Sequence, residues 1–197
     1  MSQTAKTKQR ILESALKLFS QKGYLGTTTK EIAREAGIAE VTLFRYFPSK
    51  GLLFGEVINT YSFLPTLKEI LEKIKEEPCE KGLKIIAHEF LKMLEGKKDL
   101  IKIMHSEMQR YPEEIKKIYE NIIENTIILL AEYLKKLQEK KILRNFDSIF
   151  GARAFLGMFF SYFYAKEIKE WLNLKKENTE EIINAYVDIF LKGILKS

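Results

Sequence analysis

Apolar residues recur every three or four positions along almost the whole sequence, and no segment alternates in the way that a half-buried β-strand does. This period predicts an all-α fold of about nine helices, three short ones near the N-terminus and six longer ones after them. Glycines and prolines divide the pattern into these helices. The first of them is expected over residues 6–22, where one face carries Ile11, Leu12, Ala15, Leu16 and Phe19.

Two short helices with clear end signals are expected between residues 28 and 47. Thr28 and Glu31 have the spacing of a capping box, in which a hydroxyl and a carboxylate each bind a backbone N–H at the start of a helix. Gly37 ends the first helix, and Pro48 prevents the second from continuing. Two helices of about two turns each, joined by a glycine turn, have the proportions of a helix-turn-helix motif.

The positive charge of the chain is concentrated in its first quarter. The 197 residues include 33 Lys and Arg against 27 Asp and Glu, which gives a formal charge of +6. Residues 1–50 hold nine of the basic and four of the acidic residues, whereas the remaining 147 residues hold 24 and 23. A basic module joined to a near-neutral body indicates an anionic partner at one end, with nucleic acid ahead of a membrane.

The outer side of the second short helix is predicted by turning it 100° per residue with Leu43 facing the core. A helix of two turns gains no stability from an exposed aromatic or guanidinium group. In a DNA major groove, however, Arg reads guanine edges and apolar groups meet thymine methyls, while hydroxyl and ammonium groups bind phosphates. The outer residues are Val41, Thr42, Phe44 and Arg45, flanked by Glu40 and Tyr46, and those suited to phosphates are Thr42, Tyr46 and Lys50.

The segment of about residues 8–60 resembles the TetR family of bacterial transcriptional regulators. The motifs that carry the resemblance are Gly23-Tyr-x-x-Thr-Thr-Thr, Ile32-Ala-x-x-Ala-Gly-Ile and Thr42-Leu-Phe-Arg-Tyr-Phe-Pro-Ser-Lys-x-x-Leu53. The resemblance implies a DNA-binding domain over residues 1–62 and a ligand-binding and dimerisation domain over 63–197. It also implies a homodimer with recognition helices in successive major grooves. DNA contacts are then expected at Thr28, Thr29, Glu40, Val41, Thr42, Phe44, Tyr46 and Lys50.

The chain departs from the usual TetR pattern at two positions of this motif. Phe44 stands where a Tyr is common, and it lacks the hydroxyl that could meet a phosphate. Ala39 stands where Ser is common, so the second short helix has no side-chain oxygen to cap it.

The last two long helices are expected to form the dimer interface, as the resemblance implies. Residues 147–172 interleave small and aromatic side chains at three- and four-residue spacing, which allows another helix to approach closely. The alternative is that the same residues form only the core of one chain. The predicted interface residues are Gly151, Ala154, Phe155, Met158, Tyr162, Ala185 and Ile189.

The helices of about residues 63–141 are expected, again by resemblance, to enclose a pocket for a small apolar or amphipathic effector. Aromatic and Met side chains suit an adaptable apolar cavity. At helical spacing, such residues can equally form plain core. The candidate lining residues are Phe63, Phe90, Met104, His105, Met108, Tyr119, Tyr162 and Trp171.

We therefore expect a cytoplasmic repressor that leaves a palindromic, double-stranded DNA operator when an effector binds. The alternative is a helical architectural or adaptor protein that contacts nucleic acid without sequence preference. No nucleophile–base pair, phosphate loop or nucleotide motif indicates an enzyme. The two His residues lie apart and the single Cys cannot pair within the chain, so neither a metal nor another cofactor is expected. No signal peptide or membrane span is expected.

Overall fold

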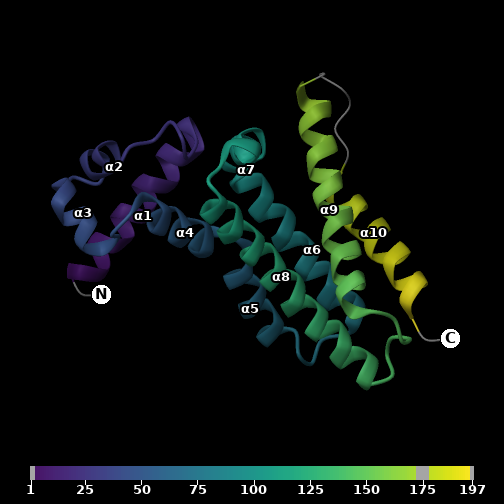
Figure 1. The fold of residues 1–197 in the computed structure, drawn as a ribbon. Coiled ribbons are helices and arrows are strands. Elements are labelled where there is room, and N and C mark those ends of the chain that lie inside the picture. The colour runs from purple at the N-terminus through teal and green to yellow at the C-terminus, as the bar shows by residue number, and fades with distance from the viewer. Residues whose placement is uncertain (1–2, 172–177, 196–197) are drawn as a thin grey trace. The chain divides into compact units, whose positions relative to one another are not determined.

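The computed structural model describes residues 3–171 and 178–195, without the side chains of residues 114 and 168–171. Regular structure in these residues is all helical, apart from one isolated β-bridge between Leu143 and Leu195. Figure 1 shows the order of the helices along the chain. Within the described residues they are α1 (Gln3–Lys22), α2 (Thr29–Glu35), α3 (Glu40–Tyr46), α4 (Lys50–Tyr61), α5 (Phe63–Lys73), α6 (Cys79–Gly96), α7 (Lys98–Glu107), the 3-10 helix η1 (Met108–Arg110), α8 (Glu113–Glu139), α9 (Ser148–Trp171) and α10 (Thr179–Ile194).

The all-α fold class is confirmed, and the described residues contain one α-helix beyond the nine expected. The additional helix is α5, in a segment where the sequence shows two proline breaks. Pro65 lies in the first turn of α5, where its missing N–H would have no partner in any case. Pro78 directly precedes α6. Each proline therefore lies at the beginning of a helix.

The chain forms two compact units. The first unit comprises residues 1–62 together with 97–122, and the second comprises 63–96 together with 123–197. Helix α7, η1 and the first turns of α8 thus belong to the unit that holds the helix-turn-helix. The functional division of the chain at residue 62 stays a prediction.

The core of the first unit surrounds α1, which packs against α2, α4 and α7. Phe19 of α1 and Phe54 of α4 are fully buried, and their rings contact each other edge to face at 5.1 Å. Tyr24 and Tyr111 extend this aromatic group, with ring centroids 6.0 Å apart. The short helices α2 and α3 add the fully buried Ile32 and Leu43 to the same core. Because α2 and α3 are too short to be stable alone, this burial holds them in place.

The core of the second unit surrounds α6, which packs against α5, α9 and α10. The aromatic rings of α9 contribute much of it: Phe155 packs against Phe159 and against Phe190 of α10, at 5.1 Å in both cases. Phe155 and Phe159 belong to an apolar stretch of the sequence that lies in α9. No helix in the described ranges is both long enough and apolar enough to cross a membrane.

Candidate nucleic-acid interface

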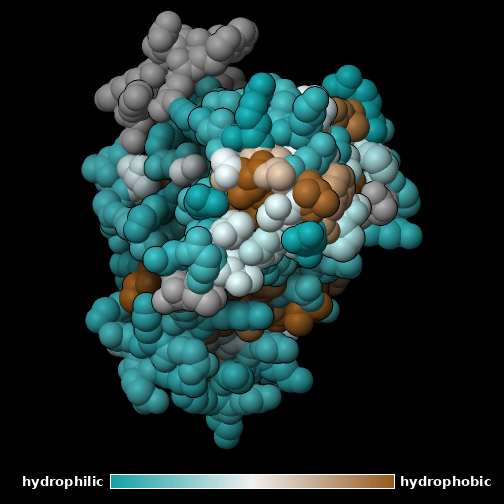
Figure 2. Space-filling model, turned by 90° about the vertical axis from the view of Figure 1, so that its left-hand side faces the viewer, coloured by the Kyte–Doolittle hydropathy of each residue, from teal (hydrophilic) through white to brown (hydrophobic). Residues whose placement is uncertain are grey.

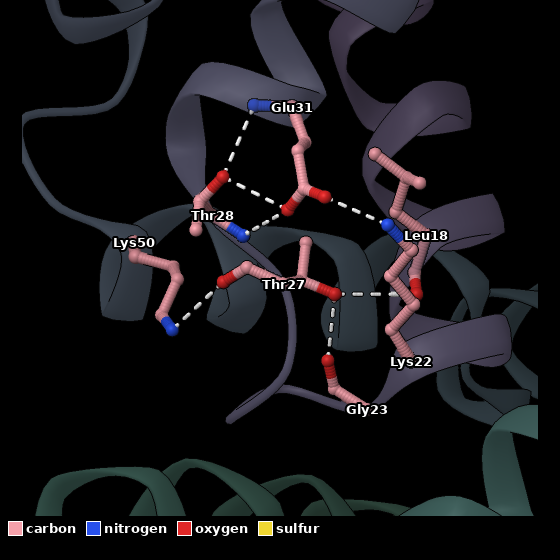
Figure 3. Close-up of polar contacts among 7 residues, drawn as sticks. All are labelled: Leu18, Lys22, Gly23, Thr27, Thr28, Glu31 and Lys50. Atoms are coloured by element: carbon pink, nitrogen blue, oxygen red, sulfur yellow. Dashed lines mark hydrogen bonds and ion pairs between the residues drawn. The ribbon is translucent and has the colours of Figure 1, made fainter.

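Helix α2 begins with the capping box that the sequence predicts. The Glu31 N–H donates to Thr28 Oγ1 at 3.2 Å, and the Thr28 N–H donates to Glu31 Oε2 at 2.9 Å (Figure 3). Lys22, at the end of α1, donates to Glu31 Oε1 at 2.7 Å. These bonds, with the one from Lys22 the largest cause, lower the pKa of Glu31 from 4.5 to about 2. The box therefore caps α2 and also joins it to α1.

The turn between α2 and α3 has the backbone geometry of a glycine helix end. Gly37 has a φ of +65°, in the region that residues with a Cβ rarely adopt. The Ile38 N–H donates to the Ala33 carbonyl at 3.0 Å, which satisfies a terminal carbonyl of α2. Ala39 makes no side-chain hydrogen bond that caps α3, because its methyl group has no acceptor atom. The angle between the two helices is therefore set by Gly37 and by the buried Leu43.

Helix α3 exposes the residues that helical rotation places outward. Val41 is 64% exposed and Phe44 is 42% exposed, whereas Leu43 between them is completely buried. Arg45 is exposed beside them, and Thr42 and Tyr46 are half-buried. Figure 2, which views the side of Figure 1 where α2 and α3 lie, shows brown apolar areas at several separate places on a mainly teal face. Solvated apolar groups on so short a helix suit a surface that is covered by a partner.

The two short helices are linked directly through their first residues. The Thr29 hydroxyl donates to Glu40 Oε1 at 2.7 Å. Both residues are half-buried, and both belong to the predicted DNA contacts. The bond fixes the Glu40 carboxylate at the N-terminal end of α3.

Lys50 lies at the start of α4, but its ammonium group has partners within the protein. It donates to the Tyr24 carbonyl at 2.9 Å and to the Thr27 carbonyl at 3.0 Å. Burial lowers its pKa, while the nearby Glu107 carboxylate opposes that shift. The sequence motif predicts a phosphate contact here, and the structure shows an internal contact.

Glu107 is a candidate positioning residue that the sequence does not single out. Glu107, at the end of α7, accepts a hydrogen bond of 3.1 Å from the Tyr24 N–H. Gly23 has a φ of +73°, and a Cβ on it would collide with the Glu107 carboxylate. No local pattern marks Glu107, because its partner lies 83 residues earlier in the chain.

The predicted ligand-lining residues divide between the two units. In the second unit, the rings of Phe63 and Phe90 pack against each other at 4.9 Å. Tyr162 in the same unit is buried, and its hydroxyl has no hydrogen-bond partner among the described residues. Trp171 ends α9, and its side chain lies outside the described part of the structure. The other four candidates belong to the first unit, where Met104 is buried, Met108 and Tyr119 are half-buried, and His105 is exposed.

The predicted dimer residues occupy two different sides of α9 and α10. Phe155 and Tyr162 are buried within the second unit, and Gly151 is packed against the Phe146 ring. These three residues therefore cannot contact a second chain directly, and can only pack beneath the residues that do. Ala154, Ala185 and Ile189 are exposed, and Met158 is half-buried.

Taken together, the fold and this surface define a helix-turn-helix DNA-binding protein with an additional all-α unit. The family described as "Bacterial regulatory proteins, tetR family" matches residues 11–57, and the family "AefR-like transcriptional repressor, C-terminal domain" matches residues 81–193. The chain belongs to the TetR family of bacterial transcriptional regulators, and is a DNA-binding regulator of transcription.

Individual relatives agree with this assignment. The chain is 35% identical over 157 residues to the uncharacterized HTH-type transcriptional regulator YvkB of Bacillus subtilis, covering 80% of this chain and 81% of YvkB. A solved Mesorhizobium loti structure assigned to the TetR family shares the fold over all of both chains, with a TM-score of 0.79 and 24% identity. The structure of FadR from Bacillus subtilis in complex with stearoyl-CoA shares it over 94% of this chain and 98% of FadR, with a TM-score of 0.76 and 18% identity.

Proposed function

We propose that this regulator is a cytoplasmic, homodimeric repressor that leaves a palindromic operator when a small apolar or amphipathic effector binds its C-terminal domain. The observation that carries the proposal is the outward face of α3, on which Val41 and Phe44 are exposed beside Arg45. A two-turn helix held by its buried face and presenting these side chains matches the geometry of a recognition helix in a major groove.

The residues of α2 and α3 divide into three roles in this proposal. Arg45 reads guanine, and Val41 with Phe44 contacts thymine methyls. Thr42 and Tyr46 bind phosphates and fix the register of the helix on the duplex, as does Thr28 at the start of α2. Glu40, oriented by Thr29, accepts a hydrogen bond from a base edge.

A twofold dimer is supported by an exposed row of small and apolar residues on α9 and α10. Phe150 is 70% exposed and Ile189 is 61% exposed. Ala154 and Gly157 lie four and seven residues after Phe150 on α9, and Ala185 lies four residues before Ile189 on α10; all three are exposed. Nothing lies within 4 Å of a Cβ placed on Gly157. A second copy of the chain would cover this row and provide the second recognition helix that a palindromic site requires.

The effector site is proposed within the second unit. Tyr162 offers a buried hydroxyl that has no partner within the described ranges, and a polar group on the effector would satisfy it. Apolar parts of the effector would contact neighbouring aromatic side chains, among which Tyr186 lies 6.3 Å from Tyr162 between ring centroids. FadR was solved with stearoyl-CoA, an amphipathic acyl chain on a polar carrier, and this compound is the first probe.

Release of the operator follows from differential binding. The effector must bind more tightly to a dimer whose recognition helices no longer match the spacing of about 34–36 Å between successive major grooves. The compound then shifts the population of dimers away from the form that binds DNA.

The proposal is tested by selecting duplexes from a random library with the wild-type protein and measuring their affinity by fluorescence anisotropy. We expect recovery of a palindrome whose binding survives moderate salt, and release of the labelled duplex by stearoyl-CoA. Binding without sequence preference would favour an architectural protein. Specific binding that stearoyl-CoA does not reverse would exclude long-chain acyl-CoA as the effector.

A further inference from the structure

The backbone of Tyr24 is held from two directions by oppositely charged side chains. Its N–H donates to Glu107 Oε2 at 3.1 Å, and its carbonyl accepts a hydrogen bond from Lys50 Nζ at 2.9 Å. Tyr24 lies in the turn between α1 and α2, while its two partners lie 26 and 83 residues further along the chain. One peptide segment therefore bridges α4 and α7.

Lys50 makes two further contacts with the same turn. Its ammonium group donates to the Thr27 carbonyl at 3.0 Å, as Figure 3 shows, and lies 4.3 Å from the centroid of the Tyr24 ring. Two of its three N–H donors are thus used by backbone carbonyls, and the aromatic face adds a cation–π contact. The ammonium group is therefore directed at the turn, and only its third N–H is left for a phosphate.

The turn that Lys50 holds leads directly into the predicted DNA-contact residues. The Thr27 side chain is buried and donates to the Gly23 carbonyl at 2.7 Å, which fixes the turn internally. Thr28 caps α2, and Thr29 bonds to Glu40 of α3. A displacement of the turn would therefore be transmitted to the start of the recognition helix.

We propose that Lys50 acts in operator binding as a positioning residue, which together with Glu107 holds the α1–α2 turn, and not as a phosphate contact. This inference rests on the DNA-binding function and concerns how one of its residues works. Glu107 has the complementary role: it draws the Tyr24 N–H toward α7 while Lys50 holds the carbonyl.

The salt dependence of operator binding distinguishes the two roles of Lys50. Each phosphate contact that is lost reduces the slope of log K against log[salt] by about 0.9. We expect Lys50→Met to weaken binding of the selected duplex about tenfold, as for one lost charged hydrogen bond, with an unchanged slope. Arg45→Met should instead relax the preference for guanine at one position of the duplex, and Lys68→Met, which removes an exposed charge on α5, should change neither the affinity nor the slope.

Whether replacing Glu107 strengthens or weakens operator binding gives an independent test. Removing a negative charge from a DNA-binding unit should strengthen binding if only electrostatics matter. We expect Glu107→Met to weaken it several-fold instead, because the Tyr24 N–H loses its acceptor. The double variant should lose less than the two single variants combined, since both act through one peptide segment.

Three results would overturn the inference: a slope reduced by about 0.9 in Lys50→Met, tighter binding by Glu107→Met, or fully additive losses. Circular dichroism and dimer mass establish that each variant is folded. If Lys50→Met does not fold, the sign of the Glu107→Met effect decides the matter. Because the wild-type protein is measured on the same duplex, failure of specific DNA binding itself would be recognised separately.

Discussion

Thr29 at the start of α2 donates a hydrogen bond of 2.7 Å to the carboxylate of Glu40 at the start of α3. The two helices meet again through their buried faces, where Ile32 and Leu43 are fully enclosed. The hydrogen bond thus restrains the first residues of α2 and α3 relative to each other, in addition to the apolar contacts of their buried faces. It also determines which way the Glu40 carboxylate faces when α3 approaches a partner.

Replacing Thr29 with Val keeps the shape of the side chain and removes the hydroxyl. We expect operator affinity to fall about fivefold, corresponding to roughly 1 kcal/mol for one hydrogen bond to a partly exposed carboxylate. Fluorescence anisotropy with the selected duplex measures the loss. Thr60→Val, on the exposed surface of α4, is the matched control. Equal affinities of these two variants would show that the bond does not orient Glu40 for binding.

Substitutions at two adjacent residues of α3 should affect different properties, one the stability of the fold and the other the affinity for DNA. Leu43 is fully buried, so Leu43→Ala should lower the free energy of unfolding by about 2–5 kcal/mol. Phe44 is 42% exposed, so Phe44→Ala should leave stability nearly unchanged and weaken operator binding roughly tenfold. Thermal unfolding and DNA titration of both variants test this contrast. A Phe44→Ala protein that is strongly destabilised but binds normally would reverse the assigned roles.

The capping carboxylate of Glu31 should make stability depend on acid pH. Its pKa falls from 4.5 to about 2 in the folded chain, so the deprotonated form favours folding. This contribution is complete above about pH 4.5 and is lost as the pH falls toward 2. The difference in melting temperature between wild type and Glu31→Gln should therefore shrink over that interval. Glu120→Gln, an exposed carboxylate within α8, controls for loss of one charge. A difference that stays constant with pH would contradict the assignment.

A charge on the exposed row of α9 should prevent dimerisation. Gly157→Glu places a carboxylate where the chain leaves open space, so each chain should fold normally but remain a monomer. Gly96→Glu is a matched control, because a Cβ there also meets nothing within 4 Å. Light scattering coupled to size exclusion measures the mass of both variants. A dimeric Gly157→Glu protein would place the interface elsewhere.

The buried hydroxyl of Tyr162 should cost stability in the absence of an effector. Tyr162→Phe removes a polar group that has no hydrogen-bond partner in the part of the chain that the structure describes, so the free energy of unfolding should rise by about 1 kcal/mol. Tyr186→Phe, at a half-buried ring beside it, is the control. Chemical denaturation measures both. A loss of stability in Tyr162→Phe would mean that the hydroxyl is satisfied within the folded chain.

Features that depend on a few neighbouring residues were predictable from the sequence. The capping box of Thr28 and Glu31 and the turn at Gly37 follow from backbone chemistry within one or two helical turns. The inward Leu43 and outward Phe44 follow from helical rotation alone. Helix α5 escaped prediction because Pro65 signals an interruption equally well whether a helix ends before it or begins around it.

The sequence by itself determined the all-α class, the basic first quarter and the face that α3 presents, because periodicity, charge and capping are local properties. Only the tertiary structure decided where charged side chains and whole segments find their partners. Lys50 faces the Tyr24 and Thr27 carbonyls, and Glu107 reaches the Tyr24 N–H across 83 residues of chain. Residues 97–122 belong to the first unit because α7 packs against α1. Contacts between elements distant in sequence depend on packing that no local pattern encodes.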